Sequence, residues 1–237
     1  MMEGSVVYLQ PVYILQHKPY RETSLILEVF SQDFGLLSVL AKGVRKQKSK
    51  TAGLLLPFAR LNLSYFDRNQ LKLLLDAEYV QHHDLQKLSL YCGFYVNELI
   101  QRFLHKHDPD PELFMLYQHC LQQLADSPGQ QVESCLRYFE LDLLQQTGYG
   151  VQLDVEALSG EPVESRLTYR YSPQQGLVAD RKGNVEGQTL LMLAARQPLD
   201  SRALIQAKYL LRLMLAPFLQ DKPLKSRAVL AKVMNYL

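Results

Sequence analysis

The chain has little cysteine and no long apolar run, and each shortage excludes a class of protein. Its 237 residues include three cysteines, Cys92, Cys120 and Cys135, which are widely spaced and form no CxxC pair. This spacing argues against a disulfide framework or a zinc knuckle, and we expect all three to be small buried side chains on helices. No stretch approaches the 18 uncharged apolar residues that a membrane span requires.

Motifs for catalysis and nucleotide binding are also missing. The sequence has no GxxxxGK[ST] loop, no GxGxxG after a strand and no GxSxG elbow. The clusters His82-His83 and His105-Lys106-His107 have no cysteine or paired acid at metal-ligand spacing, so we interpret them as surface or helix-end residues. Glu161-Pro162 has no partner for catalysis. We therefore predict a protein that has no active site, no cofactor and no bound metal.

Acidic residues are absent from Phe34–Phe66, which carries six cations, and five of these fall within Lys42–Lys50. Strand-like segments flank this run on both sides, so we interpret it as a basic loop on a β scaffold. A loop of this kind can neutralise several phosphates and release their counterions, although it could also be merely solvated. The candidate phosphate-binding residues are Arg21, Lys42, Arg45, Lys46, Lys48, Lys50, Arg60, Arg68 and Lys72.

Charge is distributed unevenly along the chain, although the total is only +2. Residues 1–80 carry ten Lys/Arg against seven Asp/Glu, residues 81–187 carry eight against fifteen, and residues 188–237 carry eight against two. Two basic ends therefore enclose an acidic middle. This pattern suits a protein with separate surfaces for separate partners.

The first 80 residues predict five strands, because short aliphatic or β-branched runs alternate with turn signals and no helical period lies between them. Five strands in about 80 residues favour a small closed barrel of the OB type, with an SH3-like barrel as the alternative. The predicted strands are Val6–His17, Thr23–Ser31, Gly35–Ala41, Leu54–Phe66 and Gln70–Val80.

After residue 80 the apolar spacing becomes helical. Asp110-Pro111-Glu112 is a helix start, with an N-cap, a proline in the first turn and an acid near the positive end. Gly148 stands where a helix C-terminal glycine belongs, and Asp200 or Ser201 should cap a later helix. The predicted helices are 84–106, 110–125, 131–147, one from near Gln188, 201–219 and one after Pro223. A hairpin is predicted from Arg166–Tyr171 and Gly176–Ala179, with Ser172–Gln175 as its turn. The fold class is therefore α+β.

Two further surfaces can be proposed from spacing. Arg137 lies one turn from Leu141 and two turns from Leu144, so an arginine beside an apolar groove could hold an acidic peptide with an apolar end. The alternative is a rim arginine whose stem covers the core. Barrel aromatic residues could stack bases, or could belong to the core. These aromatic candidates are Phe58, Tyr65, Phe66 and Tyr79.

Several short segments, taken in order along nearly the whole chain, resemble the RecO family of bacterial recombination mediators, in particular its gamma-proteobacterial members. They are Tyr20–Leu25, Ala41–Arg45, Leu55–Phe58, Leu90-Tyr91 with Tyr95–Leu99, Leu136–Glu140 with Gly148–Gly150, Ser159–Pro162 and Lys222–Arg227. The specificity lies in the ordered set and not in any single segment.

The resemblance implies an OB-fold DNA-binding domain at residues 1–80, a helical domain at 81–149 and 188–237, and a small β insert at 150–187. It implies binding of single- and double-stranded DNA, strand annealing, and loading of RecA on DNA coated by the single-strand-binding protein SSB, with RecR as partner. Arg137 matches an arginine implicated in binding the acidic SSB tail, and Leu136, Leu141 and Leu144 would accompany it. A second basic surface, or a RecR contact, would comprise Lys222, Lys225, Arg227 and Lys232.

One departure concerns a metal. Many RecO proteins carry a four-cysteine zinc site after the position of Gly150, whereas Val151–Gly187 contains no cysteine here. We therefore predict an insert without zinc, held by packing.

Met1–Gly4 lacks the features of a secretion signal, so we expect a cytoplasmic, nucleoid-associated protein. The rival interpretations are a helical adaptor whose barrel binds protein, and a nuclease, which would need clustered metal-binding acids.

Overall fold

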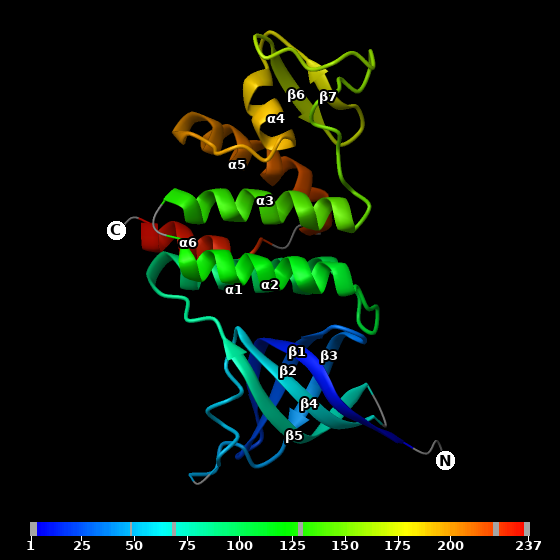
Figure 1. The fold of residues 1–237 in the computed structure, drawn as a ribbon, viewed down its shortest axis with the longest axis vertical. Helices are drawn as coiled ribbons and strands as arrows, with labels where there is room; N and C mark the ends of the chain where they lie inside the picture. The colour runs from blue at the N-terminus through cyan, green and yellow to red at the C-terminus, as the bar shows by residue number, and fades with distance from the viewer. Residues whose placement is uncertain (1–3, 48, 68–69, 128–129, 220–222, 235–237) are drawn as a thin grey trace. The chain divides into compact units, whose positions relative to one another are not determined.

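The computed structural model describes residues 4–47, 49–67, 70–127, 130–219 and 223–234 (Figure 1). The fold is α+β and comprises two compact units. Unit 1 contains the chain as far as Ala125 together with the chain from Ala228 onward, and unit 2 contains Asp126–Arg227. The predicted domain limits at residues 80, 149 and 187 stay a prediction.

Unit 1 contains the five-stranded barrel that the sequence predicts. Its strands are β1 (Ser5–Tyr20), β2 (Ser24–Ser31), β3 (Gly35–Ala41), β4 (Ala59–Asp67) and β5 (Leu71–His82). They close in the order β1-β2-β3-β5-β4, and every pairing is antiparallel except that of β3 with β5. This is the topology of the OB fold, which confirms the prediction of an OB-type barrel.

The fourth strand begins later than predicted, at Ala59 in place of Leu54. Leu55 leaves the strand path and is fully buried in the barrel core. Phe58 has a φ of +67°, which interrupts extended structure, and its amide donates to the Ile14 carbonyl across 3.0 Å. Burial of Leu55 therefore outweighs the strand propensity of Leu54–Phe58.

Unit 1 also contains the helices α1 (Lys87–Phe103) and α2 (Pro111–Asp126), and the part of α6 (Lys225–Met234) from Ala228 onward. The ring of Tyr13, from the barrel, packs against Phe114 and Tyr117 of α2 with centroid separations of 5.3 and 5.0 Å. Asn97 of α1 donates to the Leu15 carbonyl across 2.8 Å and accepts from the Tyr117 hydroxyl across 2.6 Å. Aromatic packing and this buried polar network fix α1 and α2 to β1.

The first helix is shorter than predicted, because residues beyond Phe103 pair with the barrel. Lys106 forms a parallel bridge with Leu36, and the His107 amide donates to the Leu36 carbonyl across 3.2 Å. The Lys106 ammonium also donates to Ser38 Oγ across 2.9 Å. The segment between α1 and α2 thus covers the start of β3, where β5 is not paired.

Unit 2 is mainly helical. Its elements are α3 (Gln130–Gln146), β6 (Thr168–Ser172), β7 (Gly176–Ala179), β8 (Val185–Glu186), α4 (Gly187–Ala194), α5 (Ser201–Leu215), η1 (Ala216–Leu219) and the first residues of α6 (Lys225–Met234). Gly148 ends α3 with a φ of +82°, and the Tyr149 amide donates to the Leu144 carbonyl, as in a Schellman cap. Asp200 caps α5 as predicted, by accepting from the Ala203 amide across 2.7 Å.

The predicted helix to Leu219 ends as an α-helix at Leu215 and continues only as a 3-10 turn. Pro217 has no amide hydrogen for an α-helical bond, which accounts for the change. The predicted last helix after Pro223 is confirmed as α6. Cys92, Cys120 and Cys135 are all buried, as expected. Among the described residues, no helix has the length and apolar character to cross a membrane.

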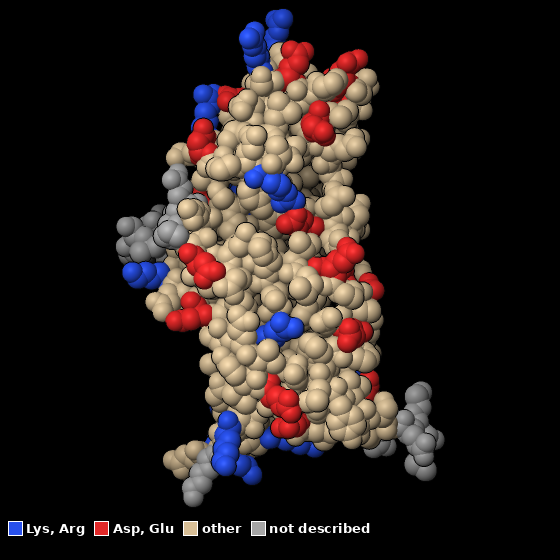
Figure 2. Space-filling view, viewed as in Figure 1, with Lys and Arg blue, Asp and Glu red and all other residues tan. Residues whose placement is uncertain are grey.

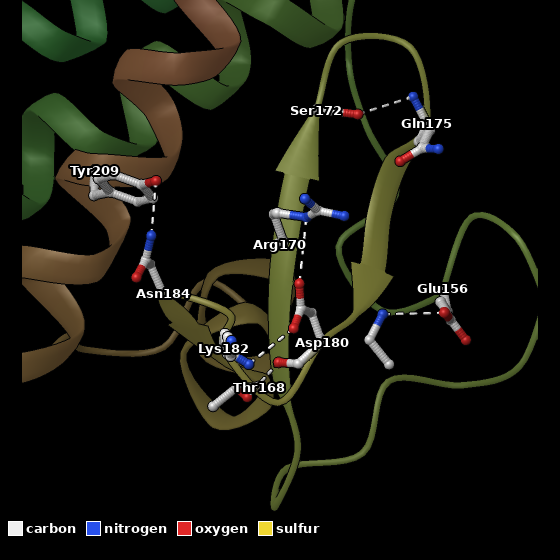
Figure 3. A network of polar contacts seen from close by, with 10 residues as sticks. Glu156, Thr168, Arg170, Ser172, Gln175, Asp180, Lys182, Asn184 and Tyr209 are labelled. Atoms are coloured by element: carbon white, nitrogen blue, oxygen red, sulfur yellow. Dashed lines mark hydrogen bonds and ion pairs between the residues drawn. The ribbon is translucent and has the colours of Figure 1, made fainter.

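The insert of unit 2 forms a three-stranded sheet in the order β7-β6-β8. The predicted hairpin is confirmed, whereas β8, with only two residues, has no sequence signal. Tyr169, Leu177 and Val185 form its buried side. Figure 3 shows that polar contacts supplement this packing: Glu156 accepts from the Ala179 amide, and Arg170 pairs with Asp180 across 3.4 Å.

Candidate nucleic-acid interface and peptide pocket

The basic loop after β3 is fixed to the barrel at its start. Val44 is buried in the barrel core although Lys42, Arg45 and Lys46 around it are charged. The Arg45 amide donates to the Thr23 carbonyl across 2.8 Å, and the Gly43 amide reaches Ser24 Oγ across 3.4 Å. The loop therefore lies against the turn that joins β1 to β2, and its cations extend from an anchored backbone.

Five of the predicted DNA-binding cations are exposed on this loop and turn: Arg21, Lys42, Arg45, Lys46 and Lys50. The Arg45 guanidinium donates to the Arg21 carbonyl across 3.3 Å, and the Arg21 guanidinium lies 5.3 Å from the centre of the Tyr20 ring. Glu22 is the acid of the same turn and is exposed. In Figure 2, blue atoms gather at the end of the barrel that bears the loop after β3. The structure thus brings the side chain of Arg45 to the backbone of Arg21.

Two other predicted DNA-binding cations, Lys72 and Arg60, lie on β5 and β4. Lys72 is buried and forms an ion pair with Asp67 across 2.5 Å. Arg60 is half-buried on β4, and its Nε has no hydrogen-bond partner among the described residues. Lys48 and Arg68 lie outside the described residues. In this conformation Lys72 therefore neutralises the carboxylate of Asp67.

Some of the aromatic candidates for base stacking are buried in the core, and others are at least partly exposed. Phe58 is buried against Phe94, with ring centres 5.0 Å apart, and Tyr65 is fully buried. Burial and the nearby carboxylates of Asp67 and Asp33 raise the pKa of Tyr65 far above its usual value. Phe58 and Tyr65 are therefore core residues. Phe66 is half-buried, and Tyr79 is 59% exposed.

The arginine predicted to hold a peptide is directed inward. Arg137 is 6% exposed, and its Nη2 pairs with Oε1 of Glu140 across 2.8 Å, one turn along α3. Leu136, Leu141 and Leu144 are also buried. Glu140 occupies Nη2 of Arg137, whereas the buried Nε of Arg137 has no hydrogen-bond partner among the described residues. The role of Arg137 in peptide binding stays a prediction.

Leu141 and Leu144 nevertheless line a pocket of about 320 Å³ in unit 2. Leu193 of α4 and Met214 of α5 supply further apolar walls. The other lining residues are Gln145, Gly150, Val151, Leu153, Asp154, Ala194 and Arg196. The volume is at the lower end of the range of about 300–1,000 Å³ for ligand sites, so the pocket can admit one apolar side chain with its neighbours.

Arg196 is the cation among the described residues that line this pocket. Sequence reasoning missed it, because it stands alone after a short helix and its partners come from α3. Its guanidinium pairs with Asp142, donates to the Tyr138 carbonyl across 3.2 Å and lies 5.2 Å from the centre of the Tyr138 ring. Arg196 therefore lies at the pocket that Leu141 and Leu144 help to line. The predicted peptide site stays a prediction.

The second predicted basic surface is only partly described. Lys225 and Lys232 are exposed on α6, and Arg227 is half-buried. Lys222 lies outside the described residues.

The insert lacks the cysteines that a zinc site of the family would use. Val151–Gly187 lacks cysteine, and in the described parts of the chain no three His, Cys, Asp or Glu side chains group as a metal site. Ser159 Oγ donates to Glu156 Oε2 across 2.5 Å, and the Ala179 amide donates to Glu156 Oε1 across 3.0 Å. These oxygens are already used in hydrogen bonds. An insert without zinc stays a prediction.

Comparisons with known proteins cover nearly the whole chain. The family model described as recombination protein O N terminal matches residues 4–83, and the model described as recombination protein O C terminal matches residues 82–228. The DNA repair protein RecO of Actinobacillus succinogenes is 42% identical over 229 residues, which are 95% of this chain and 96% of that protein. The DNA repair protein RecO of Methylococcus capsulatus is 43% identical over 228 residues, 95% of this chain and 93% of its own. These matches show that the chain belongs to the RecO family.

Proposed function

We propose that the chain is a recombination mediator that binds single- and double-stranded DNA and anneals complementary strands. Membership of the RecO family supports a role in recombinational DNA repair. The observation that carries the finer proposal is the set of five exposed cations on the loop after β3 and the turn before β2, with Val44 and Arg45 fixing the loop. Such contacts give affinity for the phosphate backbone without reading sequence.

Annealing needs no acid, base or nucleophile from the protein. Two strands repel because both are polyanions, and a cationic surface that binds both lowers the free energy of bringing them together. The loop cations would supply one surface. Lys225, Arg227 and Lys232 would supply a second, or would contact RecR.

The same proposal includes capture of SSB through its acidic tail. Support for this part of the proposal is a pocket between α3, α4 and α5 whose walls include Leu141 and Leu144. Its lining also includes a cation, Arg196, and an acid, Asp154. Releasing SSB from DNA in this way would expose the strand for annealing and, with RecR, for RecA loading.

The test is strand annealing with and without SSB, using a variant in which Lys42, Arg45, Lys46 and Lys50 are changed to Glu. A matched control reverses Arg166 and Arg181, which are exposed on the insert. We expect the loop variant to lose annealing under both conditions and the control to retain it. Equal annealing by the loop variant and the wild type would overturn the proposal.

An adaptor whose barrel binds protein is the second candidate. The observation that favours it is a set of exposed apolar side chains, Tyr8 and Leu9 on β1 and Leu75 on β5, where both strands have register shifts. The salt dependence of DNA binding separates the two functions. Phosphate contacts predict a steep fall in affinity between about 50 and 200 mM salt, whereas a pure adaptor binds DNA at neither concentration.

A further inference from the structure

We propose that Arg21 and Tyr20 form a stacking platform for one unpaired base of a DNA strand, beside the basic loop. The inference rests on the proposed function and deepens it, because it names the form of DNA that the loop surface selects. It gives Arg21 a contact with a base, whereas the charge of Arg21 alone suggests a contact with phosphate.

The two side chains already form two layers of such a stack. The Arg21 guanidinium lies over the Tyr20 ring, with its central carbon 5.3 Å from the centre of the ring. Tyr20 is half-buried, whereas Arg21 is exposed. A guanidinium is planar and stacks on aromatic faces, and unpaired bases stack on arginine planes. Because Arg21 is exposed, its guanidinium can accept a base in addition to the tyrosine ring.

The backbone of Arg21 is in a left-handed conformation that favours glycine. Its φ is +52°, and it is the first residue of the turn that joins β1 to β2. Glycine would adopt this conformation without the steric cost that a Cβ atom brings. A long side chain at a strained position therefore points to a role for the side chain itself.

Contacts with the basic loop hold the platform in place. The Arg45 guanidinium donates to the Arg21 carbonyl across 3.3 Å. Tyr20 pairs across the strands with Ser24, whose Oγ accepts from the Gly43 amide across 3.4 Å. The platform and the start of the loop are therefore adjacent, so one strand can place a base on Arg21 and its phosphates on the loop. Because both parts are held before binding, less conformational entropy is lost when the strand binds.

The charge next to Arg21 favours a base over a phosphate at this point. Glu22 follows Arg21 in the turn and is also exposed. A phosphate at Arg21 would be repelled by this carboxylate, whereas the face of a base carries no net charge. The loop cations belong to the run Phe34–Phe66, whose sequence has no acid. The turn therefore suits an uncharged base, and the loop suits phosphates.

A platform of this kind selects single strands. Each base inside a duplex is stacked on both faces and paired, so presenting it to Arg21 requires unstacking and unpairing. Stacking uses the face of the base, tolerates any sequence and leaves the pairing edge of the base free. A strand held in this way can still pair with its complement, as annealing requires.

The experiment measures the affinity of the full chain for three fluorescently labelled probes by anisotropy. The probes are an oligothymidylate, an abasic oligomer of the same length and a duplex of the same length. Arg21→Lys is the main variant, because lysine keeps the positive charge and lacks the planar group. We expect it to lose affinity for the oligothymidylate by about fivefold or more, and to bind the other two probes as the wild type does. Tyr20→Leu should show the same pattern with a smaller loss.

Two control variants separate stacking from charge. Lys46→Ala removes an exposed loop cation and should weaken the binding of every probe, because every probe has phosphates. Arg181→Lys makes the arginine-to-lysine exchange at an exposed position of the insert and should leave all three affinities unchanged. The melting temperature of Arg21→Lys should equal that of the wild type, because the side chain of Arg21 is exposed.

The outcomes distinguish the inference from the function on which it rests. If Arg21→Lys binds the oligothymidylate as tightly as the wild type, or loses affinity equally for the abasic oligomer, Arg21 does not stack on a base and the inference is overturned, while DNA binding stands. A wild type that binds the abasic oligomer as tightly as the oligothymidylate overturns it in the same way. A wild type that binds none of the probes would refute the proposed function, and the platform with it.

Discussion

The Arg45 amide donates a hydrogen bond to the Thr23 carbonyl across 2.8 Å, and this bond joins the basic loop to the turn between β1 and β2. The side chain of Arg45 then reaches the Arg21 carbonyl. Residues 24 positions apart in sequence thereby present their charges on one surface. A pinned loop loses less conformational entropy on binding than a free one, which favours its use as a phosphate-binding surface.

Substituting Arg45 with Ala should weaken DNA binding and reduce its salt dependence. Each phosphate contact contributes about 0.9 to the slope of log K against log salt, so the slope should fall by about one. Titrations of a labelled duplex at several salt concentrations measure this. Lys72→Ala is the control. Lys72 is buried against Asp67, so the salt slope of DNA binding by this variant should equal that of the wild type. An unchanged slope for Arg45→Ala would show that Arg45 does not contact phosphate.

Gly35→Ala should destabilise unit 1. Gly35 has a φ of +65°, and a Cβ atom there would lie 2.2 Å from the backbone oxygen of Asp108. The left-handed conformation alone costs about 1–2 kcal/mol for a residue with a side chain, and relief of the clash requires the segment after α1 to move from β3. Urea unfolding should therefore show a loss of about 2 kcal/mol or more.

Gly53→Ala is the matched control for this change. No heavy atom lies within 4 Å of a Cβ at Gly53, and its φ is not positive. We expect its stability to equal or slightly exceed that of the wild type, because alanine restricts the unfolded chain. A Gly35→Ala variant as stable as Gly53→Ala would contradict the packing of Asp108 on Gly35.

The sequence predicted most elements because their apolar residues repeat with the period of a strand or a helix. The strands Gly35–Ala41 and Gly176–Ala179 have the predicted limits, and Asp200 caps its helix as predicted. Periodicity could not predict β8, which pairs with β6 through only two residues. Nor could it show that Leu55, within a strand-like run, turns into the barrel core.

The candidate site was predictable only in part, because charge is visible in a sequence and burial is not. Lys42, Arg45, Lys46 and Lys50 are exposed. Lys72 belongs to an internal ion pair instead, because Asp67, five residues earlier, lies beside it across the turn between β4 and β5. Arg196 had no signal, because its partners Tyr138 and Asp142 lie more than 50 residues earlier.

Tyr117→Phe should destabilise unit 1 without altering its surface. The Tyr117 hydroxyl is fully buried, donates to Asn97 Oδ1, and its pKa is raised well above the usual value because burial disfavours the phenolate. Without the Tyr117 hydroxyl, the buried Asn97 oxygen loses this hydrogen bond. The free energy of unfolding should therefore fall by about 1–3 kcal/mol. Tyr209→Phe removes an exposed hydroxyl bonded to Asn184 and should change the unfolding free energy by less than about 0.5 kcal/mol. Equal stability of the two variants would contradict the buried network.

Glu156 should make the stability of the insert sensitive to acid. Hydrogen bonds from Ser159 and from the Ala179 amide hold the pKa of this carboxyl below its ordinary value of 4.5. The pKa is lower in the folded state than in the unfolded state, so the stabilisation is complete above the ordinary value. The stabilisation is lost as pH falls through the lowered pKa of Glu156 in the folded state. Stability should therefore depend on this group at pH values below 4.5.

Glu156→Gln should therefore lower the melting temperature at pH about 7, and this deficit should diminish towards pH about 3, because the wild-type carboxylate becomes protonated as pH falls through its lowered pKa. Glu164→Gln is the control, because the Glu164 carboxylate makes no hydrogen bond or ion pair among the described residues. The control should melt as the wild type does at both pH values. A deficit of Glu156→Gln that persists undiminished at pH about 3 would mean that the carboxylate charge does not hold the loop to β7. In that case the loss of stability would come from a small change in side-chain shape or hydrogen bonding and not from the loss of the charge.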